Sequence, residues 1–525
     1  MLLNSFLENS AAAYPDKTAL ICGNRRVTYA EINSGANALA HAFRALGLAR
    51  QDRVCVYYDN SVETVMGVFA AMKASGVFLI VNPGVKGPKL SYILNDCNVR
   101  ILLTGRRNLS AVETDIAQST DLRHVVVVDG PGEDQSSFAA IRAAGKSVHS
   151  LDDLLSAHSR NLPSNANIDL DLASLIYTSG STGNPKGVML THLNMVAAAT
   201  SITTYLCNVP DDIILNCLPL SFDYGLYQVL MAFKVGGTVV LEKAFSYPGR
   251  YLELVCKERV TGLPIVPTIL AILLNLKNLD EHDFSTVRYL TNTAQALPPH
   301  HVARIRKVLP RARIYSMYGL TECKRVAYLP PELIDKKPAS VGIAIPNTEV
   351  WIEDDCGNPI TAPWQPGELV VRGAHVMAGY WNKPEETARY LKPGRYGRER
   401  ILRTGDLFQQ DEDGHLYFIS RKDDLIKTAG ERVGPREVEN VIYELEPVKE
   451  AAVIGVPDEI LGNAIKAFIA LREGVELTGS EVMLHCKRRL ESFMVPKYVE
   501  FRPELPKTIT GKISKKELSL ATTAP

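Results

Sequence analysis

Short apolar runs alternate with longer amphipathic stretches over most of this chain, and that alternation limits its fold more than any other feature. Residues 53–58, 77–81, 125–128 and 238–241 are rich in Val, Ile, Leu and aromatic side chains, and residues 62–73 between the first two have a helical pattern. Apolar strands separated by helices form parallel sheets that helices cover on both faces. The sequence therefore predicts an α/β fold.

The pattern changes twice toward the C-terminus. Residues 340–420 contain the turns Pro366-Gly367 and Asp413-Gly414 between short strands, which predicts a β-rich subdomain. The charged segment 421–424 then leads into another small α/β unit. We expect an N-terminal domain over residues 1–420, with the β-rich subdomain at 340–420, and a small C-terminal domain over residues 421–525.

Composition limits the partners and the compartment. The 525 residues include 58 Lys+Arg and 58 Asp+Glu, so net charge provides no reason to expect nucleic acid or an anionic membrane as a partner. The nine cysteines include no Cys-x-x-Cys pair, which is typical of reduced thiols in a cytoplasmic enzyme. The start of the chain lacks a basic region, so no signal peptide is expected. The apolar stretch 260–276 contains Pro264 and Pro267, so it predicts a buried strand-turn-helix rather than a membrane span.

The strongest chemical signal is the loop Tyr-Thr-Ser-Gly-Ser-Thr-Gly-Asn-Pro-Lys-Gly at residues 177–187. Its glycines let the backbone approach a ligand closely, and its hydroxyls and N–H groups are donors for phosphate oxygens. Lys186 adds a positive charge. The spacing differs from that of a Walker loop. The alternative is a flexible Gly/Ser loop without function.

This loop resembles the phosphate loop of the adenylate-forming enzymes, the superfamily of acyl-CoA synthetases, peptide-synthetase adenylation domains and luciferases. Five further segments resemble that family's motifs in the family's order: residues 14–16 with 27–31, 318–322, 404–406, 430–433 and 510–512. The resemblance implies a large N-terminal domain of two parallel αβα sheets and a β-rich subdomain, followed by a small mobile C-terminal domain. It also implies a hinge at Asp423.

The resemblance implies roles for single residues. Glu322 would hold Mg²⁺, which prefers hard oxygen ligands and needs few of them. Asp406 would accept hydrogen bonds from both ribose hydroxyls, and Lys512 would bridge the substrate carboxylate and the α-phosphate. The implied catalytic residues are Lys512, Thr178 and Glu322. The implied ATP-binding residues are Thr178, Ser179, Gly180, Ser181, Thr182, Gly183, Lys186, Asn292, Thr293, Ala294, Tyr318, Gly319, Thr321, Asp406, Arg421 and Lys512.

Each role has a plainer alternative. Asp406 could be the Asp of a β-turn, Glu322 a solvated residue at a helix N-terminus, and Lys512 an ordinary surface lysine. His192, His300 and His301 have no third ligand at metal spacing and no nucleophile partner, so we interpret them as ordinary surface or cap residues.

The implied reaction has two steps. A carboxylate attacks the α-phosphorus of ATP, pyrophosphate leaves, and an acyl-adenylate stays bound; this chemistry requires mainly positioning and charge neutralisation. The C-terminal domain then rotates about Asp423, withdraws Lys512 and brings the loop of Gly430 to a thiol, which takes the acyl group. The cofactors implied are ATP and Mg²⁺.

The substrate prediction depends on Asp223. Phe222-Asp223 resembles the amino-acid-activating domains, in which the Asp pairs with the substrate ammonium, because a buried carboxylate requires a cation. The alternative is a plain carboxylic acid, with Asp223 paired to Lys324 or Arg325. The implied substrate pocket is Phe222, Asp223, Tyr224, Tyr227, Asn292, Met317 and Arg325.

Segments 221–225, 321–325 and 328–331 also resemble stand-alone prolyl adenylation enzymes. The expected function is therefore to load a small, proline-like amino or imino acid onto the phosphopantetheine of a carrier protein in trans. Two alternatives stay open. One is an acyl-CoA ligase for an aromatic or aliphatic acid, and the other is a non-catalytic nucleotide-binding relative.

Overall fold

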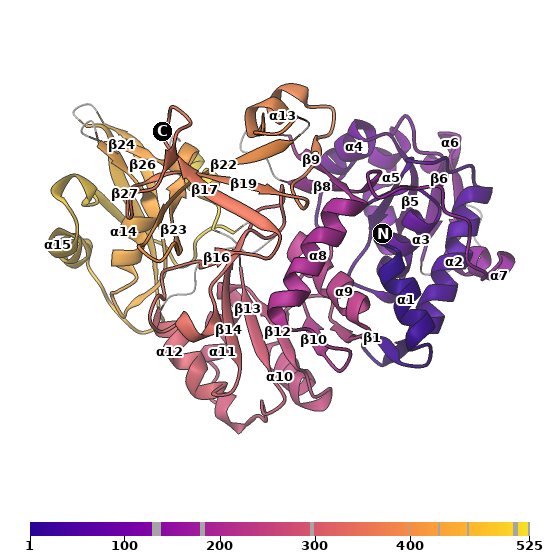
Figure 1. Cartoon of the computed structure of the whole chain (residues 1–525), viewed down its shortest axis with the longest axis horizontal. Helices are drawn as coiled ribbons and strands as arrows, with labels where there is room; N and C mark the ends of the chain where they lie inside the picture. Colours follow the sequence, from indigo (N-terminus) through magenta and orange to yellow (C-terminus); the bar gives the residue numbers. More distant parts are fainter. Residues whose placement is uncertain are drawn as a thin grey trace.

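The structure is a computed structural model that describes residues 1–128, 138–178, 184–293, 299–397, 399–428, 431–458, 461–507 and 513–522, with backbone only at 280, 299, 300, 423, 432, 516 and 520–522. Figure 1 shows α1–α3 at one end of the long axis, α14 and α15 at the other end, and β17, β19 and β22 between them. The predicted α/β class is confirmed.

The first large sheet has the order β20-β9-β8-β4-β3-β5-β6-β7. The strands from β8 to β7 run parallel, while β9 and β20 add an antiparallel edge. The strands are β3 (Arg53–Tyr57), β4 (Val77–Ile80), β5 (Val99–Thr104), β6 (His124–Val127), β7 (Ser147–Ser150), β8 (Leu172–Thr178), β9 (Lys186–Thr191) and β20 (Gly379–Tyr380). Their helices are α3 (Val62–Lys73), α4 (Gly87–Asp96), α5 (Arg106–Ala117), α6 (Ala139–Ala143) and α7 (Leu151–Ala157).

The second large sheet has the order β16-β15-β14-β13-β12-β10-β11-β1-β2 and is parallel from β14 to β1. The predicted strand-turn-helix at 260–276 is confirmed as β12 and α11. The strands are β1 (Thr18–Cys22), β2 (Arg25–Thr28), β10 (Ile213–Asn216), β11 (Thr238–Leu241), β12 (Gly262–Ile265), β13 (Tyr289–Asn292), β14 (Arg313–Tyr318), β15 (Ala327–Tyr328) and β16 (Ile343–Ala344). The helices are α1 (Ser5–Ala13), α2 (Tyr29–Ala45), α8 (His192–Leu206), α9 (Asp223–Val235), α10 (Pro248–Lys257), α11 (Pro267–Leu274) and α12 (Pro299–Val308), with short η1 (Leu279–Glu281) and η2 (Pro331–Leu333).

One apolar core joins the two large sheets. Phe69 of α3 stacks on Phe233 of α9 at a centroid distance of 5.5 Å, and Tyr29 of α2 meets the same ring edge-on at 5.3 Å. Helices from both sheets therefore share a buried layer. Side chains that converge between the sheets are held by a rigid, close-packed interior.

The predicted β-rich subdomain is present as a third sheet, ordered β18-β17-β19-β22-β21, with β23 paired to β22. Its strands are antiparallel. They are β17 (Thr348–Glu353), β18 (Pro359–Ile360), β19 (Gly367–Gly373), β21 (Leu391–Pro393), β22 (Arg400–Gln410) and β23 (Leu416–Arg421), and helix α13 (Pro384–Tyr390) lies beside them.

The C-terminal elements have cores of their own, whose buried residues all lie between Ile426 and Leu518. This separation supports the division at residue 421, which stays our proposal, as does the hinge at Asp423 in η3 (Lys422–Asp424). The elements are β24 (Ile426–Thr428), β25 (Glu431–Val433), α14 (Pro435–Ile442), β26 (Val448–Asp458), β27 (Gly462–Leu471), α15 (Gly479–Arg489), η4 (Ser492–Met494), β28 (Tyr498–Phe501) and α16 (Lys515–Thr522).

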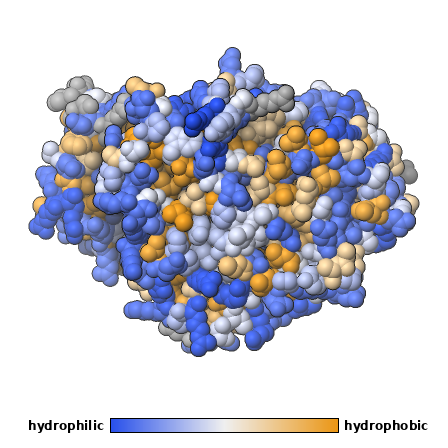
Figure 2. Space-filling model, in the orientation of Figure 1, coloured by the Kyte–Doolittle hydropathy of each residue, from blue (hydrophilic) through white to orange (hydrophobic). Residues whose placement is uncertain are grey.

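Local sequence explains where several helices begin. Thr28, Thr191 and Thr478 each accept a hydrogen bond from the backbone of the residue three positions on, whose side chain bonds back to the threonine N–H. This capping box satisfies N–H groups that the first helical turn leaves free. On the face drawn in Figure 2, hydrophobic residues lie among hydrophilic ones. Among the residues that the structure describes, no helix is long and apolar enough to cross a membrane.

Candidate active site

The phosphate-loop motif joins β8 to β9. These strands form an antiparallel pair in which Thr178 lies opposite Lys186. Residues 179–183 fall outside the described residues, so the predicted roles of Ser179, Gly180, Ser181, Thr182 and Gly183 stay predictions. A Cβ on Gly187 would lie 3.1 Å from the ring of Tyr177, so the close approach of the two strands favours glycine there.

Lys186 of this motif already has an acidic partner. Its Nζ donates to Glu386 of α13 at 2.6 Å and lies 5.7 Å from the ring centroid of Tyr380. We expected this ammonium to face phosphate oxygens. In the structure it pairs with a carboxylate from a segment 200 residues away in the chain, an arrangement without a local sequence signal.

Asp406 lies in a strand. The predicted alternative, an Asp in a β-turn, is wrong: residues 404–406 belong to β22, which bulges between Arg403 and Leu407 opposite β19. Gly405 has φ +72°, a backbone conformation that disfavours other residues, at the centre of this bulge. The bulge changes the direction of the strand where Asp406 sits.

Tyr318 holds Asp406 from a different sheet. Its hydroxyl donates to Oδ2 of Asp406 at 2.5 Å, and the Asp406 carboxylate is buried. Burial and the neighbouring Asp406 raise the pKa of Tyr318 well above its usual range, so the phenol stays protonated and remains a donor. Nε of Arg421, whose side chain is 60% exposed, lies 3.6 Å from Oδ1 of Asp406. The structure thus brings Tyr318, Asp406 and Arg421 together.

Glu322 lies in the turn between β14 and β15. Its alternative interpretation, a residue at a helix N-terminus, is wrong because residues 321–323 form a turn. Oε1 of Glu322 accepts a 2.6 Å hydrogen bond from the hydroxyl of Tyr380 in β20. Burial and Glu322 raise the pKa of Tyr380, so this hydroxyl also stays a donor. A Cβ on Gly319 would lie 2.1 Å from the carbonyl oxygen of Lys324, so the turn requires glycine there.

The buried carboxylate of Asp223 is paired with a cation of the protein. Nζ of Lys324 donates to Oδ2 of Asp223 at 3.2 Å, and both residues are buried. Burial lowers the pKa of Lys324 to about 7, Asp223 acts in the opposite direction, and Arg325 lowers it further. The ammonium also lies 4.5 Å from the ring centroid of Tyr227. This geometry favours the alternative in which Asp223 serves a protein lysine rather than a substrate ammonium.

The other predicted pocket residues converge on the same place. Asn292 and Thr293 are buried at the end of β13, and Asn292 pairs with Ser316 of β14. Tyr224 donates to the carbonyl oxygen of Thr291 at 2.8 Å, and Phe222 meets the Tyr224 ring edge-on at 6.3 Å. The parallel strands β13 and β14 thus place their C-terminal ends beside α9, at the edge where parallel sheets bind ligands.

Four further residues with predicted roles lie wholly or partly outside the part of the chain that the structure describes. Lys512, Ala294 and Gly430 lie among the residues that the structure does not describe, and of Asp423 only the backbone is described. Their roles stay predictions.

The predicted surface or cap position of His192 is wrong. Its side chain is completely buried; Nδ1 accepts a 3.0 Å hydrogen bond from the N–H of Leu3, and Nε2 lies 3.3 Å from Nδ2 of Asn167. Burial lowers its pKa to about 4. A neutral imidazole joins the segment before α1 to the start of α8, because a charged ring could not accept the proton of Leu3. His301 is half-buried, and the side chain of His300 is not described.

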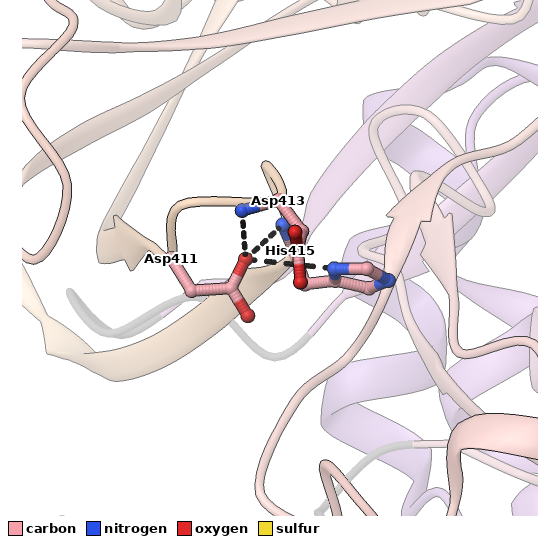
Figure 3. A group of neighbouring side chains, drawn as sticks. All are labelled: Asp411, Asp413 and His415. Carbon is pink, nitrogen blue, oxygen red and sulfur yellow. Dashed lines mark hydrogen bonds and ion pairs between the residues drawn. The ribbon is translucent and has the colours of Figure 1, made fainter.

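A second acidic cluster contains Asp411, Asp413 and His415, whose ligand atoms lie within 4.8 Å of one another (Figure 3). Nζ of Lys337 lies 2.7 Å from Oδ2 of Asp411 and 2.6 Å from Oδ2 of Asp413. The lysine forms an ion pair with each carboxylate, and these contacts link the β22–β23 turn to the segment before β16.

Sequence reasoning missed Tyr380 and Glu386, which contact Glu322 and Lys186. Neither residue lies in a motif with a chemical pattern, and their partners are 58 and 200 residues away. Only the pairing of β20 with β9 brings them to the site, so a single sequence contains no signal for them.

The chain is similar to known proteins over almost its whole length. Residues 7–381 match the family model described as AMP-binding enzyme, and residues 437–512 match the AMP-binding enzyme C-terminal domain. The chain is 33% identical to a long-chain-fatty-acid–CoA ligase of Bacillus subtilis over 98% of this chain and 94% of that protein. It is 30% identical to an indoleacetate–CoA ligase of Aromatoleum aromaticum over 99% of this chain and 98% of that protein. A crystal structure of the anthranilate CoA ligase AuaEII with anthranoyl-AMP matches with a TM-score of 0.88 and 27% identity over 99% of this chain and 97% of that one.

Proposed function

This chain belongs to the AMP-binding enzyme family, and we propose that, as an AMP-forming acid–thiol ligase of that family, it joins a carboxylic acid to free coenzyme A. The observation that carries the proposal is the buried contact between Asp223 and Lys324. A carboxylate that already has a protein cation is not available to a substrate ammonium, so the pocket does not select for amino acids. The relatives compared above are named CoA ligases, which supports the same choice.

The expected loading of a proline-like acid onto a carrier protein has less support. It depended on an unpaired Asp223, and Lys324 supplies the pairing. The names of the relatives give free CoA, not a carrier protein, as their thiol. We therefore treat carrier loading as the outcome that would overturn the proposal.

The described residues fit ATP. Asp406 would hold the ribose, because its buried carboxylate is acceptor-only and is kept in place by Tyr318 and the bulge at Gly405. Thr178 and Lys186 border the loop that would surround the phosphates. To bind phosphate oxygens, Lys186 would have to leave Glu386. The ammonium would then have a phosphate instead of a carboxylate as its negatively charged partner.

Glu322 fits Mg²⁺. Tyr380 orients the Glu322 carboxylate through a hydrogen bond to Oε1, and among the described residues Oε2 has no hydrogen-bond or ion-pair partner and would be the ligand atom. Mg²⁺ usually binds one or two carboxylates together with phosphate oxygens. When bound, it neutralises charge that develops on the phosphates.

The second half-reaction follows the family pattern. We propose that Lys512 acts in adenylation and leaves the site when the C-terminal domain rotates about Asp423. The separate apolar cores on the two sides of residue 421 support rotation as a rigid unit.

The test is ATP–pyrophosphate exchange followed by thioester formation. The panel contains proline and other amino acids beside aliphatic and aromatic acids without an amine, and the thiol is either free CoA or a phosphopantetheine-loaded carrier protein. We expect exchange with acids that lack an amine and thioester only with free CoA. Exchange restricted to amine-bearing acids, or transfer only to the carrier protein, would overturn the proposal.

A further inference from the structure

The guanidinium of Arg325 is a buried charge with open donors. The residue is 2% exposed, and its Nε and Nη1 have no hydrogen-bond partner among the residues that the structure describes. An arginine cannot lose its charge in a protein, and a buried charge without acceptors is costly. Buried guanidinium groups are therefore normally paired with a carboxylate or a phosphate.

Among the described residues, the neighbours of Arg325 supply a phenol oxygen but no carboxylate ion pair, and neither its Nε nor its Nη1 has an acceptor. Its Cζ lies 5.4 Å from the ring centroid of Tyr224, a cation–π contact that stabilises the charge but accepts no hydrogen bond in the guanidinium plane. The guanidinium also lies close to Tyr205. Burial raises the pKa of the Tyr205 phenol, and the charge and hydrogen bonding of Arg325 lower it by less. Tyr205 stays neutral and donates its own proton to Sδ of Met317 at 3.0 Å.

The local charges are also unbalanced. Lys324 and Arg325 are two adjacent buried cations, and Asp223, the carboxylate that contacts Lys324, neutralises one charge. Burial is the main cause of the lowered pKa of Lys324, and repulsion from Arg325 lowers that pKa further. An added anion would correct this imbalance.

The position of Arg325 connects it to the reaction. Tyr318, which holds Asp406, ends β14, and Glu322 and Arg325 both lie on the connection from β14 to β15. Arg325 packs against Tyr224 of α9, on the side of the predicted acyl pocket. A single turn thus presents nucleotide-facing groups at its start and a buried guanidinium at its end.

We infer that the acid activated by this enzyme carries a second anionic group, a distal carboxylate, and that Arg325 binds it. This inference rests on the proposed ligase function and specifies its substrate class as a dicarboxylic acid. The guanidinium forms paired, parallel hydrogen bonds with a carboxylate, which suits the open Nε and Nη1 donors. Lys324 pairs with the Asp223 carboxylate and so reduces the repulsion between Asp223 and the distal carboxylate of the substrate.

The test compares matched acids in the intact enzyme. The pairs are succinate with butyrate, glutarate with pentanoate, adipate with hexanoate, and isophthalate with benzoate, each assayed by ATP–pyrophosphate exchange. For the preferred chain length, we expect a diacid-to-monoacid ratio of kcat/KM of about 10² or more, the worth of one charge-assisted pair of hydrogen bonds. In Arg325→Met that ratio should fall by about 10²-fold, and Arg325→Lys should retain part of it.

Controls separate this inference from folding and from the proposed function. Arg250→Met, which removes a half-exposed arginine paired with Glu242, should leave the ratio unchanged. The thermal shift that glutarate or adipate causes should disappear in Arg325→Met if that variant folds. Exchange with monoacids in preference to diacids would overturn the inference and leave the ligase function standing. Absence of exchange with every acid would instead contradict the ligase function.

Discussion

Nζ of Lys324 lies 3.2 Å from Oδ2 of Asp223, in a contact that is buried on both sides. The two residues are 101 positions apart in the chain and meet because α9 packs beside the turn that follows β14. The contact gives the Asp223 carboxylate a protein cation, which is why we propose that it does not bind a substrate ammonium.

The first prediction concerns this pair. Asp223→Asn removes the charge that raises the pKa of Lys324, so the buried lysine either loses its proton or stays charged without a counter-ion, and the free energy of unfolding should fall by up to about 3 kcal/mol. The double variant Asp223→Asn/Lys324→Met should recover much of that loss. Urea unfolding of the four proteins measures the coupling. Additive losses would mean that the contact contributes nothing beyond two separate side chains.

The second prediction concerns Glu322 and Tyr380. Glu322→Gln should slow pyrophosphate exchange by about 10²–10³-fold, because a charged ligand near the phosphates is lost. Tyr380→Phe removes only the hydroxyl that orients Glu322 and should cost about 10-fold, with a higher Mg²⁺ concentration needed for half-maximal rate. Tyr390→Phe is the matched control, since Tyr390 touches the Tyr380 ring edge-on at 5.9 Å. An equal loss in the control would assign the effect to packing.

The third prediction separates the half-reactions. Lys512→Ala should abolish adenylation but still convert a supplied acyl-adenylate to its CoA thioester, because the lysine is proposed to leave the site before thiolation. Product analysis by mass spectrometry distinguishes the two steps. Loss of both activities would contradict the proposed domain rotation.

The fourth prediction is a pH dependence of stability. The pKa of His192 is lowered from 6.5 to about 4 by burial, so the unfolded chain binds a proton at a higher pH than the folded protein does. The stability that the neutral ring provides is complete above pH 6.5 and is lost as the pH falls toward 4.

Between pH 7 and pH 5 this difference amounts to about 2 kcal/mol. His192→Gln should therefore lose that much less stability than the wild type over this interval in urea unfolding. His375→Gln should behave in the same way, because burial lowers the pKa of His375 to about 4 as well. Identical pH profiles in all three proteins would show that these rings remain solvated.

Part of this protein follows from short-range sequence. The alternation of apolar runs and helical stretches predicted β3, α3, β4 and β11 within a residue or two, because period and propensity are local properties. The order of six short motifs predicted the family, since each motif places a chemical group on one loop. The prolines of residues 260–276 predicted the break between β12 and α11 for the same local reason.

The tertiary structure decided which charges meet. The Asp223 carboxylate, the Glu322 carboxylate and the Lys186 ammonium acquire Lys324, Tyr380 and Glu386 as partners across 58 to 200 residues of chain. No local pattern encodes such pairings, because they arise where strand ends from separate sheets converge. The prediction of a surface or cap position for His192 is wrong, since its ring is buried where the segment before α1 and Asn167 contact it. Local sequence predicted many of the elements and the family. Only packing determined which buried charges are paired, and among the described residues it leaves Nε and Nη1 of Arg325 without an acceptor.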